Sequence, residues 1–597
     1  MRSLFLCLLC LPVFASAQSI YYTVEAPNAA HHEAEITVTV QGAKTDSVEF
    51  VMSKASPGRY ATHEFAKNVY NVRAVDAKNN PLTVVKSASN AYKVKNAATI
   101  KLTYTLFANR ADGTYAGIAR NGYQLNIPAS FIWVRGLDQT PVSVEFKNLP
   151  EGWSVASQLF PTAKKEVFTA PNFQYFMDSP IKVGKLHWRN WTVKNPNGKT
   201  YTIELALEAD APAVAIDSFT NNLKKVVDES IAIFGEVPEF DNGKFTFIAS
   251  LNPYIQGDGM EHRNSTIVNS RRQFDGSNSF MGTFAHEFFH AWNVERIRPK
   301  SLEPFQYDQV NMSEALWLAE GFTQYYTSVI MTRAGLMTPE VFLRSMNGLI
   351  NSKESAPGGK YSAVENSQRA VFVDAGVAVD ETNYQNMFSS YYSHGGALGL
   401  ALDLQLRSQF NKTLDDFMTA LWVKHGKTEI PYTLPDVEKV LESITNKSFA
   451  QKFFNDYVYN SRPINYSTLL NQAGYELALM SENSNWIGGG MFRPGKTGLV
   501  VETATRKFTP LYDAGLDVGD EIISVNGVTV KKKEDLDQVI NSLKIGESVN
   551  IEFISYGDTI QSKLKIEANP AQVIKPMTNK TSAQEAFVQK WIGAKRK

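Results

Sequence analysis

The sequence predicts a multidomain α+β protein with an N-terminal β-sandwich, a mixed domain whose second half is helical, and a small C-terminal domain. Three observations support this prediction. The chain has 597 residues, which is more than one domain usually holds. Alternating polar and apolar residues dominate up to about residue 181, whereas helical periodicity dominates between about residues 337 and 479. After residue 483, short strands and glycine turns return and indicate a further domain.

The composition is that of an ordinary globular protein. Hydrophobic residues make up 43% of the chain and charged residues 20%, which is enough apolar material for several cores. The formal net charge is zero, from 60 basic and 60 acidic residues. This balance gives no reason to expect nucleic acid or an anionic membrane surface as a partner.

Residues 1–17 have the pattern of a secretory signal peptide. A basic start, an apolar run over 4–14 and a small-x-small ending predict cleavage after Ala17. The apolar run is too short to span a bilayer, and no later stretch is long and apolar enough. Both cysteines, Cys7 and Cys10, lie in this segment, so the mature chain has no thiol for catalysis, metal binding or disulfides. We therefore expect a periplasmic or secreted bacterial protein.

Residues 18–197 are predicted to form an antiparallel β-sandwich. Short alternating segments such as 35–40, 48–52 and 99–106 are separated by turn residues. No catalytic constellation is found in this part. We expect it to form one side of the active site that the next domain carries.

The following domain, predicted over residues 198–482, contains the pattern His-Glu-x-x-His at 286–290. On a helix, His286 and His290 project from one face and can share one Zn²⁺, while Glu287 can reach the water that the metal holds. We expect this helix to be capped near Ser277–Ser279 and to end at Pro299. The same short pattern also occurs by chance in helices. On its own, it is equally compatible with two histidines that bind no metal and lie on the surface or in the core.

Glu320 is the best candidate for a third metal ligand. It lies on a second predicted helix, which we expect to start near Ser313 with Glu314 in its first turn. Apolar residues form one face of this helix, and a separate polar line contains Glu320, Thr323, Gln324 and Thr327. A carboxylate on such a line is usually solvated, but in combination with His286 and His290 it favours a zinc peptidase site with one position left for water.

Residues 256–266 are predicted to form an edge strand beside the metal site. An extended peptide could pair with such an edge, so Gly259, Met260 and Glu261 are candidate substrate-binding residues, with Glu261 facing a charged group on the peptide. The alternative is a plain turn. Asn293, Thr323 and Gln324 are candidates to support the metal ligands.

The C-terminal part, residues 483–570, resembles PDZ domains of bacterial proteases. The resemblance rests on the motif AGLDVGDEIISVNG at 514–527. This motif lies between predicted strands at 498–502 and 548–554. PDZ domains bind chain ends by strand addition, which implies a C-terminal peptide or a substrate segment as ligand. A module that only packs against the peptidase is the alternative. The tail, 571–597, is expected to end in a weakly amphipathic, solvated helix with a basic terminus.

The chain as a whole resembles the glycyl aminopeptidase family, zinc peptidases of the thermolysin-like gluzincin clan that carry a PDZ domain. The resemblance rests on HEFFHAWNVERIRP, LWLAEGFTQYY and GDGMEHRNST, together with the PDZ-like segment. It implies a thermolysin-like catalytic domain, one Zn²⁺ held by His286, His290 and Glu320, and Glu287 as general base. It also implies cleavage of small N-terminal residues from peptides. Glu261 matches the residue that binds the substrate's α-amino group in the related aminopeptidase N family.

The resemblance also points to Tyr392. In aminopeptidase N relatives, a tyrosine three residues before a glycine donates a hydrogen bond to the tetrahedral intermediate, and Tyr392 and Gly395 match that spacing. A phenol suits this role because it donates a hydrogen bond and is neutral at working pH. Tyr391 and His394 are alternatives, and the aromatic rings could instead only pack.

Three functions remain open from the sequence. The chain could be a zinc aminopeptidase, a periplasmic zinc endopeptidase to which the PDZ domain delivers substrates, or a peptide-binding module with an idle metal site. The third is disfavoured because every residue that the chemistry needs is present. A structural salt-bridge role is the default for Arg296 and Arg298, which follow the first motif.

Overall fold

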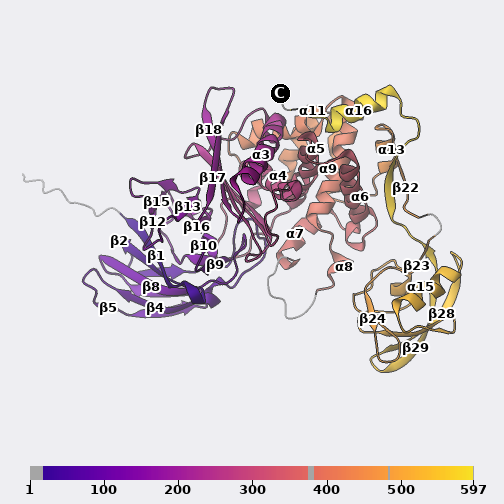
Figure 1. The fold of residues 1–597 in the computed structure, drawn as a ribbon, viewed down its shortest axis with the longest axis horizontal. Coiled ribbons are helices and arrows are strands. Elements are labelled where there is room, and N and C mark those ends of the chain that lie inside the picture. The colour runs from indigo at the N-terminus through magenta and orange to yellow at the C-terminus, as the bar shows by residue number, and fades with distance from the viewer. Residues whose placement is uncertain (1–17, 374–381, 482–483, 596–597) are drawn as a thin grey trace, which may run out of the picture.

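The computed structural model describes residues 18–373, 382–481 and 484–595, so the predicted signal peptide at 1–17 lies outside the described residues. The N-terminal sheets lie at one end, the helical part of the second domain in the middle, and the small C-terminal domain at the other end (Figure 1). Within these described ranges, no helix has the length and apolar character needed to cross a membrane.

The N-terminal domain is built from three β-sheets around one hydrophobic core, which confirms the predicted β-sandwich. The first sheet runs in the order β14 (Phe160–Pro161), β15 (Val167–Ala170), β12 (Val142–Phe146), β1 (Ser19–Asn28), β2 (Glu33–Gln41), β8 (Thr99–Phe107), β4 (Val69–Val75), β5 (Pro81–Leu82). The second contains β13 (Ser154–Ser157), β16 (Ile181–Gly184), β10 (Gly122–Leu125) and β9 (Ala116–Ala119). The third contains β11 (Trp133–Val134), β3 (Ser47–Val51), β7 (Ala91–Lys95) and β6 (Val84–Ala88).

The predicted alternation holds in these strands. Every second residue of β2 and of β8 is buried, as a sheet with one face on the core requires. One ladder departs from the antiparallel expectation, because β1 pairs with β12 in parallel. Two short helices, α1 (Ile127–Ser130) and α2 (Phe173–Met177), complete the domain.

The catalytic domain begins with a five-stranded sheet. Its order is β17 (His187–Lys194), β18 (Thr200–Glu208), β19 (Lys244–Leu251), β21 (Ser265–Ser270), β20 (Asp258–His262). The parallel strands β19 and β21 are buried on both faces, and β19 is rich in apolar residues. Strand β17 lies before residue 198 but pairs along its length with β18, so the sheet starts before the expected domain boundary.

Strand β20 is the edge of this sheet, as the sequence predicted for residues 256–266. Among the described residues it pairs with β21 alone, and the helix α4 (Met281–Phe289) follows shortly after. Helix α3 (Ala213–Phe234) packs against α4. The edge strand and the first metal-binding motif therefore lie next to each other.

The second half of the catalytic domain is helical, as predicted. Its α-helices are α5 (Thr323–Arg333), α6 (Pro339–Glu354), α7 (Ala363–Val373), α8 (Tyr384–Met387), α9 (Tyr391–Phe410), α10 (Leu414–Leu421), α11 (Leu434–Ile444), α12 (Lys447–Phe453) and α13 (Tyr466–Asn471). π-Helical turns occur at Trp317–Phe322, Trp422–Gly426 and Phe454–Val458. Short 3₁₀ turns occur at Ala29–His31, Phe65–Asn68, Asn278–Phe280, Lys300–Leu302 and Pro357–Lys360.

Two helix boundaries differ from the prediction. Helix α4 ends at Phe289 rather than at Pro299, because the carbonyl of Asn293 turns back to accept a hydrogen bond from His290 Nδ1. The second helix begins with the π-turn, after Glu314. Helix α9 begins at Tyr391 and continues through the glycines before Ala397, which serve close helix packing and do not break the helix.

The C-terminal domain has the predicted PDZ elements around its own hydrophobic core. Its sheet contains β24 (Phe492–Pro494), β25 (Leu499–Val501), β26 (Glu521–Val525), β28 (Ser548–Ser555), β29 (Asp558–Lys565) and β27 (Val528–Thr529), with helices α14 (Pro510–Asp513) and α15 (Lys533–Ser542). Asn526 and Gly527 both have positive φ, as the predicted hairpin turn requires. Two ladders pair the segments where the chain enters and leaves the domain, β22 (Tyr475–Leu479) with β31 (Gln572–Pro576) and β23 (Asn485–Trp486) with β30 (Glu567–Ala568).

The expectation of a solvated tail was wrong. Helix α16 (Ser582–Ile592) returns to the catalytic domain, as Figure 1 shows, and Trp591 is fully buried in the large catalytic core. Its indole donates to Tyr325 Oη at 2.8 Å. Lys595 Nζ donates to Asp415 Oδ2 at 2.5 Å, so this basic residue has a specific partner. The described end of the tail is therefore part of the catalytic domain.

Candidate active site and metal centre

His286 and His290 both direct one ring nitrogen to the same point. The other nitrogen of each ring has a protein partner: His286 Nδ1 lies 3.1 Å from Thr327 Oγ1, and His290 Nδ1 lies 2.6 Å from the Asn293 carbonyl oxygen. The Thr327 hydroxyl donates to the Thr323 carbonyl, so its oxygen accepts from His286. These partners place the proton of each imidazole on Nδ1 and leave Nε2 as a lone-pair donor.

Glu320 completes this arrangement from the π-turn Trp317–Phe322. The side-chain amide of Asn293 donates to the carbonyls of Leu318 and Ala319, at 3.0 Å each, and to Thr323 Oγ1 at 3.1 Å. It thus joins the residues after His290 to the turn that carries Glu320. π-Turns are rare and occur often at functional sites, because the widened turn frees backbone carbonyls for such outside donors.

The residues present fit a zinc ion. Glu320 Oε2 lies 3.5 Å from His286 Nε2 and 3.1 Å from His290 Nε2. Donors held at zinc-ligand distances in a tetrahedral site lie about 3.3 Å apart. Glu320 Oε2 is also a buried oxygen that lacks a hydrogen-bond partner among the described residues. The three predicted ligands therefore converge, in donor type and in spacing, on one position for a metal.

Glu261 and Glu287 lie beside this position. One side-chain ligand atom each from Glu261, Glu287 and His290 lie within 4.8 Å of one another. His290 therefore belongs both to this cluster and to the cluster that it forms with His286 and Glu320. Glu287 comes from α4 and Glu261 from the edge strand β20. Both are nearly buried, with 7% and 6% of their surface exposed.

Gly259 allows the edge strand to approach Glu287. A Cβ added at Gly259 would overlap Glu287 Oε1 and lie 2.8 Å from its Cδ. The strand therefore passes with its bare backbone against the carboxylate. Met260, by contrast, is fully buried and packs against Gly58 and Gly113 of the N-terminal domain.

Burial and charge set the protonation of the three carboxylates. Burial raises the pKa of Glu287 well above its ordinary value; His290 lowers it, while Glu261 and Glu320 raise it further. Burial also raises the pKa of Glu261. The pKa of Glu320 lies far below its ordinary value, because His290 and His286 outweigh the effect of burial. A cation held among these groups is what allows three buried carboxylates to be ionised together.

Tyr392 lies beside one of the proposed metal ligands. The ring centroid of Tyr392 lies 5.8 Å from that of His286. Tyr391 is buried in an apolar cluster, and its ring lies 4.7 Å from that of Tyr392 at an interplanar angle of 33°. His394 is fully buried and lies 3.3 Å from the amide of Asn366, away from the ligands.

The packing of Gly395 explains why a glycine follows Tyr392 by three residues. A Cβ at Gly395 would overlap the Trp317 carbonyl and lie 2.8 Å from Gly321 Cα. Helix α9 therefore packs with glycine against the π-turn, backbone to backbone. This contact brings Tyr392 and Glu320 to the same place although 71 positions separate them in the sequence.

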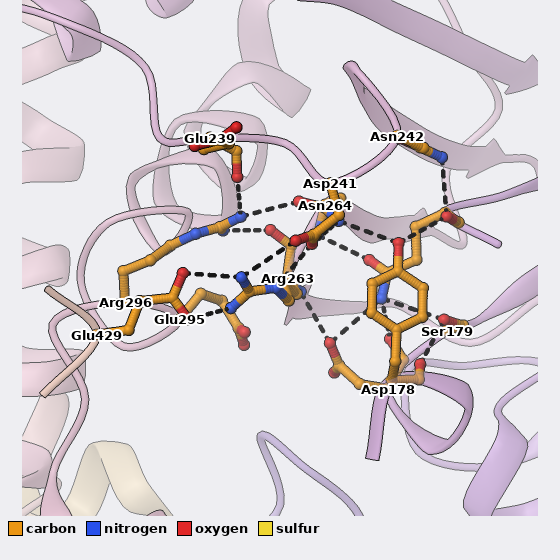
Figure 2. A network of polar contacts seen from close by, with 12 residues as sticks. Asp178, Ser179, Glu239, Asp241, Asn242, Arg263, Asn264, Glu295, Arg296 and Glu429 are labelled. Carbon is orange, nitrogen blue, oxygen red and sulfur yellow. Dashed lines mark hydrogen bonds and ion pairs between the residues drawn. The ribbon is translucent and has the colours of Figure 1, made fainter. Parts of the chain in front are cut away.

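The turn between β20 and β21 is fixed by a polar network, which Figure 2 shows. Asp178 accepts from His262 Nδ1 and from the Arg263 backbone N–H, both at 2.9 Å. Arg263 also forms ion pairs with Asp241 and with Glu429. The end of the strand that carries Glu261 is thus held by residues from three parts of the chain.

Arg296 and Arg298 have different roles from one another. The Arg296 guanidinium donates to the carbonyls of Arg263, Ala291 and Glu239 and to Asn264 Oδ1, so it acts as a buried cross-link between loops (Figure 2). Arg298 pairs with Glu303 at 2.8 Å and with Glu295 at 3.7 Å. The expected salt-bridge role holds for Arg298.

Sequence reasoning did not identify Tyr60. Its hydroxyl donates to Glu320 Oε1 at 2.9 Å, and only 1% of its surface is exposed. The adjacent Gly58 lies against Glu261: a Cβ there would be 3.0 and 3.2 Å from the two carboxylate oxygens. Tyr60 belongs to the N-terminal domain and lies 260 residues before Glu320, so no local pattern could have linked them.

Comparison with protein families and solved structures agrees with this architecture. The chain matches the peptidase M61 N-terminal domain over residues 21–185, the M61 glycyl aminopeptidase domain over 279–398 and a PDZ domain over 482–566. A search of curated protein sequences found no match.

Among solved structures, the chain is similar to an aminopeptidase N family protein from Idiomarina loihiensis. The identity is 21%, the match covers 96% of this chain and 100% of that chain, and the TM-score is 0.81, which shows a shared fold. An M1 zinc metallopeptidase from Deinococcus radiodurans matches with 14% identity over 75% of this chain and 94% of that chain, with a TM-score of 0.43.

Proposed function

We propose that the chain, which matches the M61 peptidase and PDZ domains, is a zinc aminopeptidase that removes small N-terminal residues, glycine or alanine, from peptides. The observation that carries this proposal is the convergence of His286, His290 and Glu320 on one position, with Glu287 and Glu261 beside it.

The mechanism follows from these positions. Zn²⁺ held by His286, His290 and Glu320 would supply a Lewis acid and lower the pKa of a bound water. Glu287 accepts a proton from the attacking water and returns it to the leaving amine. Tyr392, whose ring lies next to His286, donates a hydrogen bond to the oxygen on which negative charge develops.

Glu261 makes the enzyme an exopeptidase. Its nearly buried carboxylate at the sheet edge binds the α-ammonium of a peptide whose backbone pairs with β20. This pairing sets the register, so that the first peptide bond lies at Glu287. His262, which stands next to Glu261, is bound through its Nδ1 to Asp178.

Gly58 supports the preference for small first residues. The backbone of the N-terminal domain lies directly against the Glu261 carboxylate there, and Glu261 itself has only 6% of its surface exposed. Little space is left beside the group that binds the amine. Glycine and alanine fit such a space better than leucine does.

The test is zinc content together with hydrolysis of Gly-, Ala- and Leu-anilides by wild type and Glu287→Gln. We expect one zinc per chain, turnover of the Gly and Ala substrates, and loss of turnover with zinc retained in the variant. N-acetylated Gly and Ala peptides should not be cut, because Glu261 then has no ammonium to bind. Comparable cleavage of acetylated peptides would instead support the alternative, an endopeptidase.

The PDZ domain provides a second contact for peptides. Strand β24 forms the edge of its sheet, which is where a bound peptide adds as a further strand. We propose that this edge binds a peptide C-terminus or a distant segment of the substrate. Deletion of residues 484–568 should then raise KM for long peptides and leave dipeptide anilides unaffected.

We propose export as the route to the cell envelope or medium. The pattern of residues 1–17 and the absence of cysteine from residue 18 onward support it. The expected mature N-terminus is Gln18, which mass spectrometry of the protein from a periplasmic or culture fraction would test. A cytoplasmic protein that retains residues 1–17 would contradict this proposal.

A further inference from the structure

A tight turn of the N-terminal domain reaches the metal site. Arg59 N donates to Ser56 O at 3.1 Å, Pro57 occupies the second position, and Gly58 has φ +72°. This combination is the signature of a type II turn, which requires glycine in the third position. The turn directs the next residue, Tyr60, out of the sandwich and toward the catalytic domain.

Tyr60 binds one of the two carboxylate oxygens of Glu320 and leaves the other facing the histidines. Its hydroxyl donates to Oε1 at 2.9 Å, while Oε2 faces His286 Nε2 and His290 Nε2. The ring is held in place by the edge of Tyr391, at 6.0 Å between centroids and an interplanar angle of 87°. Phenol and carboxylate are both almost fully buried, so the hydrogen bond is protected from water.

We infer that Tyr60 is a positioning residue for the metal ligand Glu320, contributed by the N-terminal domain. This inference rests on the proposed zinc site. With Oε1 bound to Tyr60, Glu320 presents one oxygen to the metal and keeps a single orientation. Without the phenol, Oε1 would be a buried oxygen with no donor, and the carboxylate could rotate to offer both oxygens to the metal.

The purely structural alternative makes a different prediction. If Tyr60 only fills space among Val294, Leu316 and Tyr391, the ring is what matters and the hydroxyl is dispensable. Tyr60→Phe keeps the ring and removes only the hydroxyl, so it separates the two roles. The N-terminal domain also offers a matched control, because Tyr104 is equally buried and its hydroxyl donates to the Ser130 carbonyl at 2.8 Å within that domain.

The experiment compares wild type, Tyr60→Phe and Tyr104→Phe. The affinity for Zn²⁺ is measured by competition with a chelator, and the absorption spectrum is recorded after substitution with Co²⁺. Loss of a hydrogen-bond partner behind a metal ligand typically lowers metal affinity about 10–100-fold. We expect such a loss and an altered Co²⁺ spectrum for Tyr60→Phe, and wild-type affinity and spectrum for Tyr104→Phe.

Each outcome bears on a different claim. If wild type binds zinc and Tyr60→Phe binds it with the same affinity and the same Co²⁺ spectrum, the role of Tyr60 is overturned while the proposed function stands. If Tyr104→Phe weakens zinc binding as much as Tyr60→Phe does, the effect is general destabilisation and the inference is again overturned. If wild type binds no zinc, the proposed function itself fails, and the role of Tyr60 fails with it.

Discussion

Replacement of Gly395 by alanine tests how the helix packing positions Tyr392. The added Cβ would overlap the carbonyl oxygen of Trp317 and approach Gly321 Cα to 2.8 Å. Both neighbours are backbone atoms, so neither can move aside as a flexible side chain could. Helix α9 must therefore shift away from the π-turn that carries Glu320.

The magnitude follows from two opposing effects. Glycine to alanine inside a helix gains about 0.5–1 kcal/mol, whereas overpacking costs about 1–3 kcal/mol. We expect Gly395→Ala to lose about 1–2 kcal/mol of stability in the catalytic domain. A shift of about 1 Å in the position of a catalytic group can lower the rate on the order of 100-fold. The loss of kcat should therefore exceed what the stability change explains.

Two matched glycines in helices serve as controls. Gly399, one turn further along α9, would place its Cβ 3.3 Å from Phe322 Cδ1 and from Tyr325 Cβ, a much milder approach than the overlap at Gly395. Gly348 in α6 is exposed and a Cβ there meets nothing within 4 Å, so Gly348→Ala should stabilise the chain by about 0.5–1 kcal/mol. Urea unfolding and kcat for Gly-anilide measure all three. Wild-type stability and wild-type kcat in Gly395→Ala would refute the packing argument.

Three further changes test other parts of the molecule. Trp591→Ala should lose about 3–5 kcal/mol because the indole is fully buried, and a melting temperature equal to that of wild type would contradict this. Burial raises the pKa of Asp415, but the charges of Arg333 and Lys595 outweigh burial and hold this pKa at about 2. The ionised carboxylate therefore stabilises the fold above pH 3.8, and this stabilisation is lost as the pH falls toward 2. The stability lost in Asp415→Asn, measured by urea at pH 7 and pH 3, should therefore be smaller at pH 3. Asp178→Asn should raise KM for free-amine substrates about 10-fold with zinc content unchanged, and an unchanged KM would contradict its role in holding β20.

The residues that the structure brings together as the sequence predicted are mostly those encoded within one element. His286, Glu287 and His290 lie four positions apart at most, and the helical period alone brings them to one side of α4. Glu320 required one further inference, that a lone carboxylate on a polar line needs a cation. Edge strand β20 was recognisable because its glycines precede the carboxylate.

The helix boundaries predicted from the sequence were wrong where tertiary contacts outweigh local sequence signals. Pro299 is a strong helix breaker, yet α4 ends earlier because His290 binds the Asn293 carbonyl. Gly395 has the sequence signal of a breaker, but it lies inside α9 because the π-turn leaves no room for a side chain. The tail looked weakly amphipathic because its buried residues, Trp591 and Ile592, lie at the end of α16.

Tyr60 and Asp178 illustrate why the N-terminal domain is more than a neighbour of the active site. Tyr60 binds the carboxylate of Glu320, and Asp178 binds the turn at the end of β20, so the domain contacts both sides of the cluster. The metal ligands come from helices, whereas Glu261 comes from a sheet edge that pairs with β21 alone. An edge strand with one partner has few contacts of its own to fix its position. The distance between Glu261 and the proposed metal position, on which the proposed exopeptidase register depends, is therefore set by the docking of the two domains and not by the catalytic domain alone.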